Sequence, residues 1–544
     1  METGIKSVEG RIVDIDSCSI FEGSLHIQDG RIVAIKRHPT TQTHYITVGL
    51  VDAHVHIESS MLTPAEFGRL VVEHGTIGVV TDPHEIANVM GVEGVDFMVE
   101  SSKSSPIRTF FSIPSSVPAT PFDVAGGEIN SLDVRRMAAS GQFVALSEVM
   151  NVPGVLSGDK EVISKLEVAR EFGLPIDGHA PLILASELEV YSSQGITTDH
   201  ECVSLDEAQM KIASGMKILI RWGSAAYNYQ ALKPLIASNP RDVMFCTDDL
   251  HPDDLLESGD IDRFLRQGVA DGFDLFELLR IASINPIEHY NLPLGVLREG
   301  DSADFMVVDN LIDFNVKQLY VAGEKRFDSA DGVLCEEESL QSCPNNFNHE
   351  PILVEELSKA VSGEFAMIGI IPNELVTNLL YHRVDESVDN LESIPSADIA
   401  KVVYVNRYQN GTPQISYLQG CGITQGAFAS SVGHDSHNIV AVGCSDEELQ
   451  MAINAVIEHR GALSVAHNGE CATLPLPIGG IISPLAGREV AQLYKELDSR
   501  VKSLGCTLNA PFMTLAFLSL LVIPHVKIGE RGLFALSRFD WLES

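Results

Sequence analysis

The chain has 544 residues, a length too great for one hydrophobic core, so two or three domains are expected. Its hydrophobic content of 45% and charged content of 21% are ordinary for a folded globular protein and exclude disorder as the default. The formal net charge of −38 argues against a nucleic-acid partner, because neutralising phosphates requires clustered Lys and Arg. A neutral or cationic small substrate fits this charge better than a polyanion.

The cysteines and the apolar runs indicate in which cellular compartment the protein resides. The nine cysteines are scattered without a Cys-x-x-Cys pair, which favours reduced thiols in the cytoplasm. Met1–Arg11 lacks the apolar core of a signal peptide, and the longest apolar run, Phe512–Ile523, is too short to span a membrane. We therefore expect a cytoplasmic protein with no membrane partner. We also expect a homo-oligomer, taken to be a dimer.

Two segments that flank the centre of the chain favour β structure. Ser24–Arg37 predicts a hairpin with Asp29-Gly30 at its turn. Much later, Asp304–Phe327 is expected to hold two further strands. We expect residues 1–48 and 290–327 to pair with each other in one composite β domain.

Between these flanks, short apolar runs that end in polar residues alternate with segments long enough to include a helix. Eight such runs are predicted strands, spaced at intervals typical of a strand, a crossover helix and its loops. They end near His56, Asp82, Ser112, Glu148, His179, Asp199, Arg221 and Asp248. Residues 49–289 are therefore predicted to form a (β/α)8 barrel of the TIM type. A doubly wound open sheet is the rival, but it would place a ligand at one switch point.

The rest of the chain predicts a linker and a further domain. Residues 328–350 are acidic and polar and are the best candidate for the linker. Residues 351–544 are expected to form a separate α/β domain. The predicted fold class is therefore α/β: a TIM-type barrel, a small β-rich domain built from its flanks, and a carboxy-terminal α/β domain.

A helix over Asp446–Arg460 is the clearest element of this last domain. Ser445 and Glu448 predict a capping box at its start, and apolar residues recur along one face. Strands are expected on either side of the helix, followed by a hairpin turn. These elements are Asn438–Gly443, Ala462–His467 and the turn at Asn468-Gly469.

The ends of the barrel strands carry residues that bind metals. His54-Val55-His56 places two imidazoles on the same side of one strand, because alternate residues on a strand point the same way. Such a pair is weak by itself, since any strand can carry two polar residues on a solvated face. However, the mouth of a barrel would bring six candidate ligands together. They are His54, His56, Glu148, His179, His200 and Asp248.

Imidazoles and carboxylates without thiolates suit Zn²⁺, Mn²⁺ or Fe²⁺. One catalytic ion that keeps a position open for water needs fewer than six ligands. We therefore expect two metal ions that share Glu148. Two such ions acidify a bridging water and polarise the bond that it attacks. Asp248 is placed to take the proton of this nucleophile and return it to a leaving group. Hydrolysis at an sp² carbon is the expected reaction class.

Further residues near the mouth are candidates for substrate contact or for support of the ligands. Asp82, His84 and Glu85 follow the second strand and could contact the substrate or relay protons. Alternatively, they only start a turn and cap the next helix. Arg221 could hold a substrate acceptor or pair with a surface carboxylate, and His251 could lie behind the ligands.

A second polar cluster lies in the carboxy-terminal part of the chain. His434, Asp435 and His437 fall within four residues of each other. They could bind an additional ion or reach across to the mouth of the barrel. A polar turn without function is the alternative.

The metal motifs resemble a known family. The run Gly49–His56, with the later His, His and Asp at strand ends, resembles the amidohydrolase superfamily. Within it, the adenine deaminases are more similar still, in ordered segments that cover nearly the whole chain. These segments are Ile57–Met61, Asp82–Asn88, Val117–Pro121, Asp177–Ala180, Asp199–Cys202, Cys246–Asp249, His434–Asn438, Leu474–Gly479 and Pro511–Leu515.

The resemblance implies that four histidines hold a pair of Mn²⁺ or Fe²⁺ ions, with Glu148 bridging where many relatives use a carboxylated lysine. It implies hydrolytic deamination of adenine to hypoxanthine and ammonia in purine salvage, with hydroxide adding to C6 and Asp248 moving the proton. Two alternatives stay open. A cyclic amidohydrolase, similar to hydantoinase or dihydroorotase, would keep the barrel and the metals, although Glu148 stands against it. A metal-dependent binding protein would not need Asp248.

Overall fold

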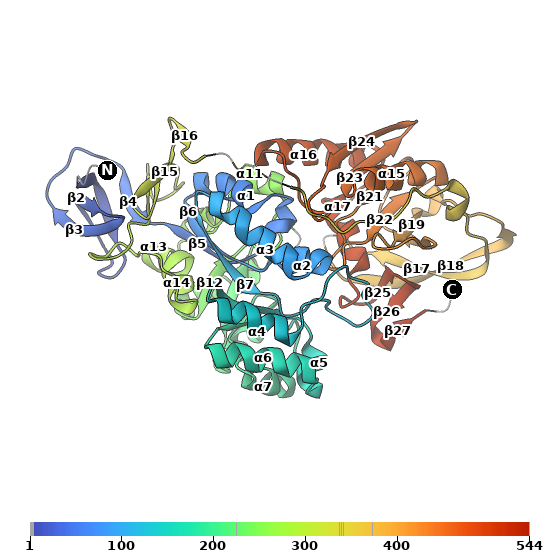
Figure 1. Ribbon diagram of the computed structural model, residues 1–544, viewed down its shortest axis with the longest axis horizontal. Helices are drawn as coiled ribbons and strands as arrows, with labels where there is room; N and C mark the ends of the chain where they lie inside the picture. The colour runs from blue at the N-terminus through green and yellow to red at the C-terminus, as the bar shows by residue number, and fades with distance from the viewer. Residues whose placement is uncertain are drawn as a thin grey trace.

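The computed structural model describes residues 5–542 except Ala225, Glu337, Ser339, Gln341 and Asn373. Figure 1 shows three parts in a row. A β sheet near the N-terminus lies at the left, a barrel surrounded by helices lies in the centre, and a mixed α/β part that carries the C-terminus lies at the right.

Eight parallel strands form the central barrel. β5 to β9 pair in chain order, and so do β10 to β12. Parallel bridges from Ile176 to Ile196 and from Val55 to Asp248 join the two sheets and close the ring. The eight strands are β5 (Leu50–Val55), β6 (Thr76–Thr81), β7 (Arg108–Ile113), β8 (Phe143–Val149), β9 (Ile176–Gly178), β10 (Thr198–Asp199), β11 (Lys217–Arg221) and β12 (Val243–Cys246). The predicted barrel is confirmed.

Burial on both faces explains why these strands are continuous apolar runs. Every residue of β5, β6 and β12 is buried, as expected for a parallel sheet covered by helices. Side-chain caps start several of the helices, as Thr63 does for α1 and Asp159 for α6. The helices are α1 (Pro64–Val71), α2 (His84–Met90), α3 (Val92–Ser101), α4 (Ser131–Ser140), α5 (Val152–Ser157), α6 (Lys160–Phe172), α7 (Ala185–Ser193), α8 (Leu205–Ala213), α9 (Tyr229–Leu232), α10 (Pro234–Ser238), α11 (Pro252–Ser258), α12 (Asp262–Ala270), α13 (Leu275–Leu279) and α14 (Asn285–His289).

The two flanks of the barrel share one sheet, in the order β16-β15-β14-β13-β4-β1-β2-β3. Its strands are β1 (Lys6–Asp14), β2 (Ser19–Gln28), β3 (Arg31–Arg37), β4 (Tyr45–Val48), β13 (Phe305–Val308), β14 (Val316–Val321), β15 (Glu324–Asp328) and β16 (Gly332–Val333). The flanks meet where β4 pairs with β13, and Asp29 and Gly30 turn the predicted hairpin with positive φ. Asp304–Phe327 contributes three strands rather than the predicted two, because the segment reverses twice.

The predicted linker lies along the barrel. Its start continues the flanking sheet as β16, and three of its residues lie outside the described residues. Thr63 donates a hydrogen bond to Glu338 at 2.6 Å, and the Asn346 amide donates to the carbonyl of Val89 at 3.1 Å. These contacts tie the segment to α1 and α2. The domain boundaries themselves stay a prediction.

A second eight-stranded sheet organises the carboxy-terminal part, in the order β18-β17-β20-β19-β22-β21-β23-β24. Its strands are β17 (Val361–Ile370), β18 (Thr377–Val388), β19 (Ile399–Val405), β20 (Gln414–Gln419), β21 (Ala427–Ser430), β22 (Ile439–Gly443), β23 (Ala462–His467) and β24 (Glu470–Pro475). Helices α15 (Asp446–Glu458), α16 (Gly487–Ser503) and α17 (Pro511–Ala516) accompany it. A small sheet of β25 (Val526–Gly529), β26 (Gly532–Ala535) and β27 (Asp540–Trp541) follows.

The predicted helix and its flanking strands are present in this part. Ser445 accepts a hydrogen bond from the Glu448 amide at the start of α15, which is one half of the predicted capping box; the Glu448 carboxylate accepts from the Ser445 hydroxyl at 3.3 Å rather than from its amide. The helix ends at Glu458, two residues early, because Arg460 adopts a φ of 54° and turns the chain out of the helix. No helix in the described part of the chain is long and apolar enough to cross a membrane.

The carboxy-terminal part docks onto the barrel through several elements. Helix α16 packs against α1 and α11, and Arg488 on α16 forms an ion pair with Glu73 at 2.6 Å. The Asn438 amide donates a hydrogen bond to the carbonyl of Val124 at 2.9 Å. Asn438 lies just before β22, so the segment between β21 and β22 is brought to the carboxyl ends of the barrel strands.

Candidate active site

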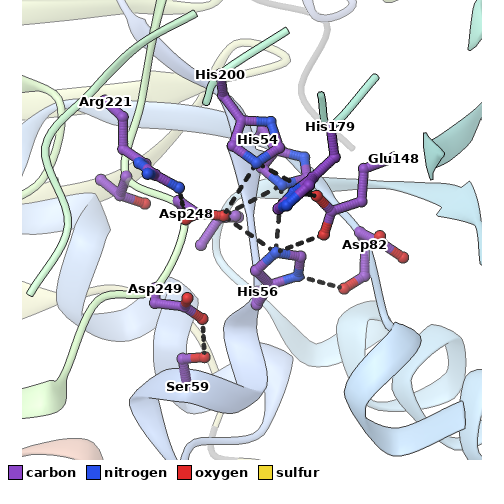
Figure 2. A network of polar contacts seen from close by, with 12 residues as sticks. His54, His56, Ser59, Asp82, Glu148, His179, His200, Arg221, Asp248 and Asp249 are labelled. Atoms are coloured by element: carbon purple, nitrogen blue, oxygen red, sulfur yellow. Dashed lines mark hydrogen bonds and ion pairs between the residues drawn. The ribbon is translucent and has the colours of Figure 1, made fainter. Parts of the chain in front are cut away.

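The six predicted ligands meet at the mouth of the barrel. They come from the ends of β5, β8, β9, β10 and β12, and Figure 2 shows their side chains pointing toward one another. All are buried except His179, whose side chain is 25% exposed. Because parallel strands present their carboxyl ends on one side of a barrel, residues almost 200 positions apart share one small space.

The His-x-His pair and Asp248 form the first half of this cluster. The Nε2 atoms of His54 and His56 lie 3.2 Å apart and face each other. Asp248 Oδ1 lies 3.3 Å from Nε2 of His54 and 3.1 Å from Nε2 of His56. Two imidazole nitrogens and one carboxylate oxygen thus converge on one point.

Glu148 connects the two halves of the cluster. Its Oε1 lies 3.4 Å from His56 Nε2, whereas its Oε2 lies 2.6 Å from His179 Nδ1 and 3.2 Å from His200 Nε2. Burial alone would raise the pKa of Glu148, but the adjacent imidazoles, His179 foremost, hold that pKa well below its usual range. An ionised carboxylate with one oxygen toward each group of histidines has the arrangement of a shared ligand.

The donor set fits a divalent metal ion. Among others, three overlapping groups each bring their donor atoms within 4.8 Å of one another. They are His56 with Asp82, His84 and Glu148; His54 with Glu148 and His200; and His54 with His56 and Asp248. Imidazole nitrogens and carboxylate oxygens in a buried site match the preferences of borderline metals.

Asp248 is held in place from several sides. Arg221 Nη1 donates to its Oδ2 at 2.7 Å, and the backbone of Asp248 bonds to His54 and His56 on β5. Burial would raise the pKa of Asp248, but Arg221 and the two histidines hold it well below its usual range. Its φ of 60° is unfavourable for a non-glycine residue, a feature that recurs at functional sites. The alternative in which Arg221 pairs with a surface carboxylate is wrong.

Glu201 is a member of the site that sequence reasoning missed. It forms an ion pair with Arg221 and lies 3.5 Å from His200 Nε2 and 3.9 Å from His179 Nδ1. Burial opposes its ionisation, but Arg221 and the two histidines lower its pKa. Its position directly after His200 was the available signal, because a carboxylate next to a ligand at a strand end enters the same mouth.

Asp82, His84 and Glu85 lie where α2 begins, but the predicted capping by His84 and Glu85 is wrong, because no side chain caps the helix at its N-cap and the Ile86 amide donates to Glu58 instead. Their contact with a substrate stays a prediction. His84 begins α2, so the segment does start a helix. Asp82 also accepts a hydrogen bond from His56 Nδ1 through its carbonyl at 3.1 Å, and its carboxylate lies 3.0 Å from His84 Nδ1. His84 Nδ1 is 3.7 Å from Glu148 Oε1, which places this helix start against the ligands.

The carboxy-terminal cluster reaches the same place. His434 Nδ1 contacts one oxygen of Glu85 and His437 Nε2 contacts the other, while Asp435 Oδ1 lies 3.8 Å from His84 Nε2. All three residues of the cluster are buried. The segment is therefore part of the barrel mouth and not a solvent-exposed turn.

His251 lies in the loop after β12 and packs against another element. Its ring centroid is 4.7 Å from that of Tyr494 on α16, and burial lowers its pKa to about 4. Among the contacts of the described residues, none joins the His251 side chain to the proposed ligands. Its supporting role stays a prediction.

Comparisons with known proteins agree with this geometry. Residues 45–326 match the amidohydrolase family, and residues 374–540 match the adenine deaminase C-terminal domain. An adenine deaminase of Methanosarcina acetivorans is 44% identical over 99% of both chains, and one of Salinibacter ruber is 42% identical over 99% of this chain and 98% of its own. The chain belongs to the adenine deaminase family of amidohydrolases.

This adenine deaminase family match covers all three parts of the fold. A third relative, from Sulfurovum sp., is 43% identical over 99% of both chains. The amidohydrolase match includes β4 and β13, which join the flanking sheet, as well as the whole barrel. The predicted resemblance is therefore confirmed along the entire chain.

A buried lysine positions two of the strand ends in this member of the family. Lys211 on α8 donates to the carbonyl of Ala180 at 2.8 Å and to Glu207 at 3.0 Å, and pairs with Asp199 at 2.9 Å. Asp199 in turn accepts a hydrogen bond from the Ala180 amide at 2.9 Å. This network fixes the residues next to His179 and His200.

We expect Lys211→Met to lower the free energy of unfolding by about 3–5 kcal/mol, because Asp199 would remain buried without its cation. Urea unfolding followed by circular dichroism measures the change. The matched control is Lys233→Met, which removes a partly exposed pair with Asp271 and should cost less than about 1 kcal/mol. Equal effects of the two substitutions would contradict this role of Lys211.

Proposed function

We propose that this protein catalyses the hydrolytic deamination of adenine to hypoxanthine and ammonia, as a step of purine salvage. One observation carries the proposal: relatives named adenine deaminase are 43–44% identical over 99% of this chain, whose barrel strand ends form the buried cluster. The cyclic-amide alternative is not favoured, because these full-length relatives are named adenine deaminase.

We assign two divalent ions per chain to the cluster, Mn²⁺ or Fe²⁺, with Zn²⁺ also suited to the donors. His54, His56, His179, His200, Glu148 and Asp248 would hold them. The two oxygens of Glu148 face different histidines, which supports a shared ligand. Bound there, such ions would acidify a water molecule and polarise the carbon that it attacks.

Asp248 is the proposed proton carrier. Its Oδ1 faces the space between His54 and His56, while Arg221 fixes its Oδ2. A carboxylate kept ionised in this way can accept a proton from the attacking water at Oδ1 and deliver it to the exocyclic nitrogen of adenine. The nitrogen then leaves as ammonia, and the oxygen of the water becomes the 6-oxo group of hypoxanthine.

The substrate would lie among residues that surround the proposed ligands. Asp82, His84 and Glu85 on one side, and Arg221 with Glu201 on the other, offer hydrogen-bond donors and acceptors to a planar base. We further propose a cytoplasmic homo-oligomer, taken to be a dimer, that binds no nucleic acid. The net charge of −38 supports the last point, since an acidic surface repels polyanions.

Purified protein loaded with Mn²⁺ should release ammonia from adenine and produce an equal amount of hypoxanthine. Ammonia detection together with ultraviolet absorbance measures both products. Adenosine and hydantoin serve as comparison substrates in the same assay. Folded, metal-loaded protein that leaves adenine unchanged, or that hydrolyses hydantoin instead, would contradict the proposal.

Asp248→Asn should lower kcat by at least about 100-fold, because the amide cannot accept the proton. Its oxygen can still face the histidines, so metal content measured by mass spectrometry should stay close to that of the unsubstituted protein. Asp271→Asn, which changes a carboxylate bonded to Lys233, is the matched control and should keep full activity. Normal turnover by Asp248→Asn would refute the proton-carrying role.

A further inference from the structure

A segment of the carboxy-terminal part holds a carboxylate of the barrel. Glu85, in the first turn of α2, is only 2% exposed, and each of its two oxygens contacts a different histidine. His434 Nδ1 contacts Oε1 and His437 Nε2 contacts Oε2. Both histidines belong to the segment between β21 and β22, about 350 residues further along the chain.

The hydrogen bonds of His437 define how it can act on Glu85. The amide of Gly433 donates to His437 Nδ1 at 3.4 Å, so this nitrogen is an acceptor and the ring proton lies on Nε2. Nε2 lies in close contact with Glu85 Oε2. The His437 side chain is 1% exposed, so no water competes for this contact.

The orientation of His434 is fixed by packing and by its backbone. Its ring stacks on Phe517 with a centroid distance of 4.5 Å and an interplanar angle of 23°. Its amide donates to the carbonyl of Ala516 at 3.0 Å, and Ser519 donates to its carbonyl at 3.4 Å. His434 is thus anchored by α17 and the turn after it, independently of the barrel.

The buried carboxylate of Glu85 needs partners that compensate for its lost hydration. An ionised carboxylate buried without compensation costs several kcal/mol, and a neutral one could not accept a hydrogen bond at both oxygens equally well. The two histidines place one ring nitrogen against each oxygen, and His434 forms a hydrogen bond there. Glu85 follows His84, whose Nδ1 lies 3.7 Å from Glu148 Oε1, so the held carboxylate borders the proposed metal centre.

We infer that His434 and His437 are positioning residues that hold the two oxygens of the Glu85 carboxylate in place at the barrel mouth. The active site is then composite, because both imidazoles come from the segment between β21 and β22 and not from the barrel. This inference rests on the proposed function. A fixed, ionised carboxylate at this place would recognise the N–H groups of an amidine edge, such as the exocyclic amine of a purine.

A third metal ion is the competing use of the same residues. His84, Glu85 and Asp435 bring donor atoms within 4.8 Å of one another, which a small cation could use. A third metal ion would raise the metal content of the protein, whereas a positioning role of the two histidines would not.

The test compares two pairs of variants in full-length, Mn²⁺-loaded protein. His434→Ala and His437→Ala remove the two ring contacts with Glu85, whereas His434→Asn and His437→Gln place an amide N–H near the lost ring nitrogen. We expect kcat/KM for adenine to fall about 100-fold in the alanine variants and to recover most of that loss in the amide variants. Metal content by mass spectrometry and the far-ultraviolet spectrum should match those of the unsubstituted protein.

His467→Ala is the matched control, because His467 lies 3.0 Å from Glu448 in the same part of the chain, remote from the barrel mouth. It should retain full activity. Alanine variants as active as the unsubstituted protein would overturn the inference. So would alanine variants that lose bound metal, or amide variants that recover no activity. An unsubstituted protein that leaves adenine unchanged would instead overturn the proposed function, on which the inference depends.

Discussion

Burial of ionised carboxylates at the mouth of the barrel is the constraint on which the rest of the structure depends. Three carboxylates are almost completely removed from water: Glu148, Asp248 and Glu85. The ionised form of each would be unstable without charged or hydrogen-bonding partners. Most of their partners come from strands, helices and a carboxy-terminal segment that are distant in sequence. The barrel, its closure and the docking of the carboxy-terminal part can all be understood as ways of supplying these partners.

The contacts that close the barrel also build the candidate active site. The bridge between Val55 and Asp248 joins the first strand to the last and at the same time sets the Asp248 carboxylate beside His54 and His56. At the other junction, Asp199 and Lys211 tie the ends of β9 and β10. An open sheet would leave these residues on opposite edges, so the chemistry depends on the ring being complete.

Much of this arrangement could be predicted, because short apolar runs that end in His, Asp or Glu mark the strand ends directly. His54, His56, Glu148, His179, His200 and Asp248 all followed from that pattern. The partners of Arg221 could not be predicted, because whether an arginine meets a surface or a buried carboxylate depends on side-chain packing. The reach of His434 and His437 to Glu85 was only one of several alternatives, since no local periodicity encodes how two domains dock. Helix α15 ended early for a similar reason, as the left-handed Arg460 carries no strong sequence signal.

Anomalous X-ray diffraction at the manganese absorption edge, from crystals of the Mn²⁺-loaded protein, tests the central claim most directly. The account predicts two peaks at the barrel mouth, among the six residues that would hold the ions. An absence of peaks among His54, His56, His179, His200 and Asp248, or peaks confined to another region of the chain, would contradict it.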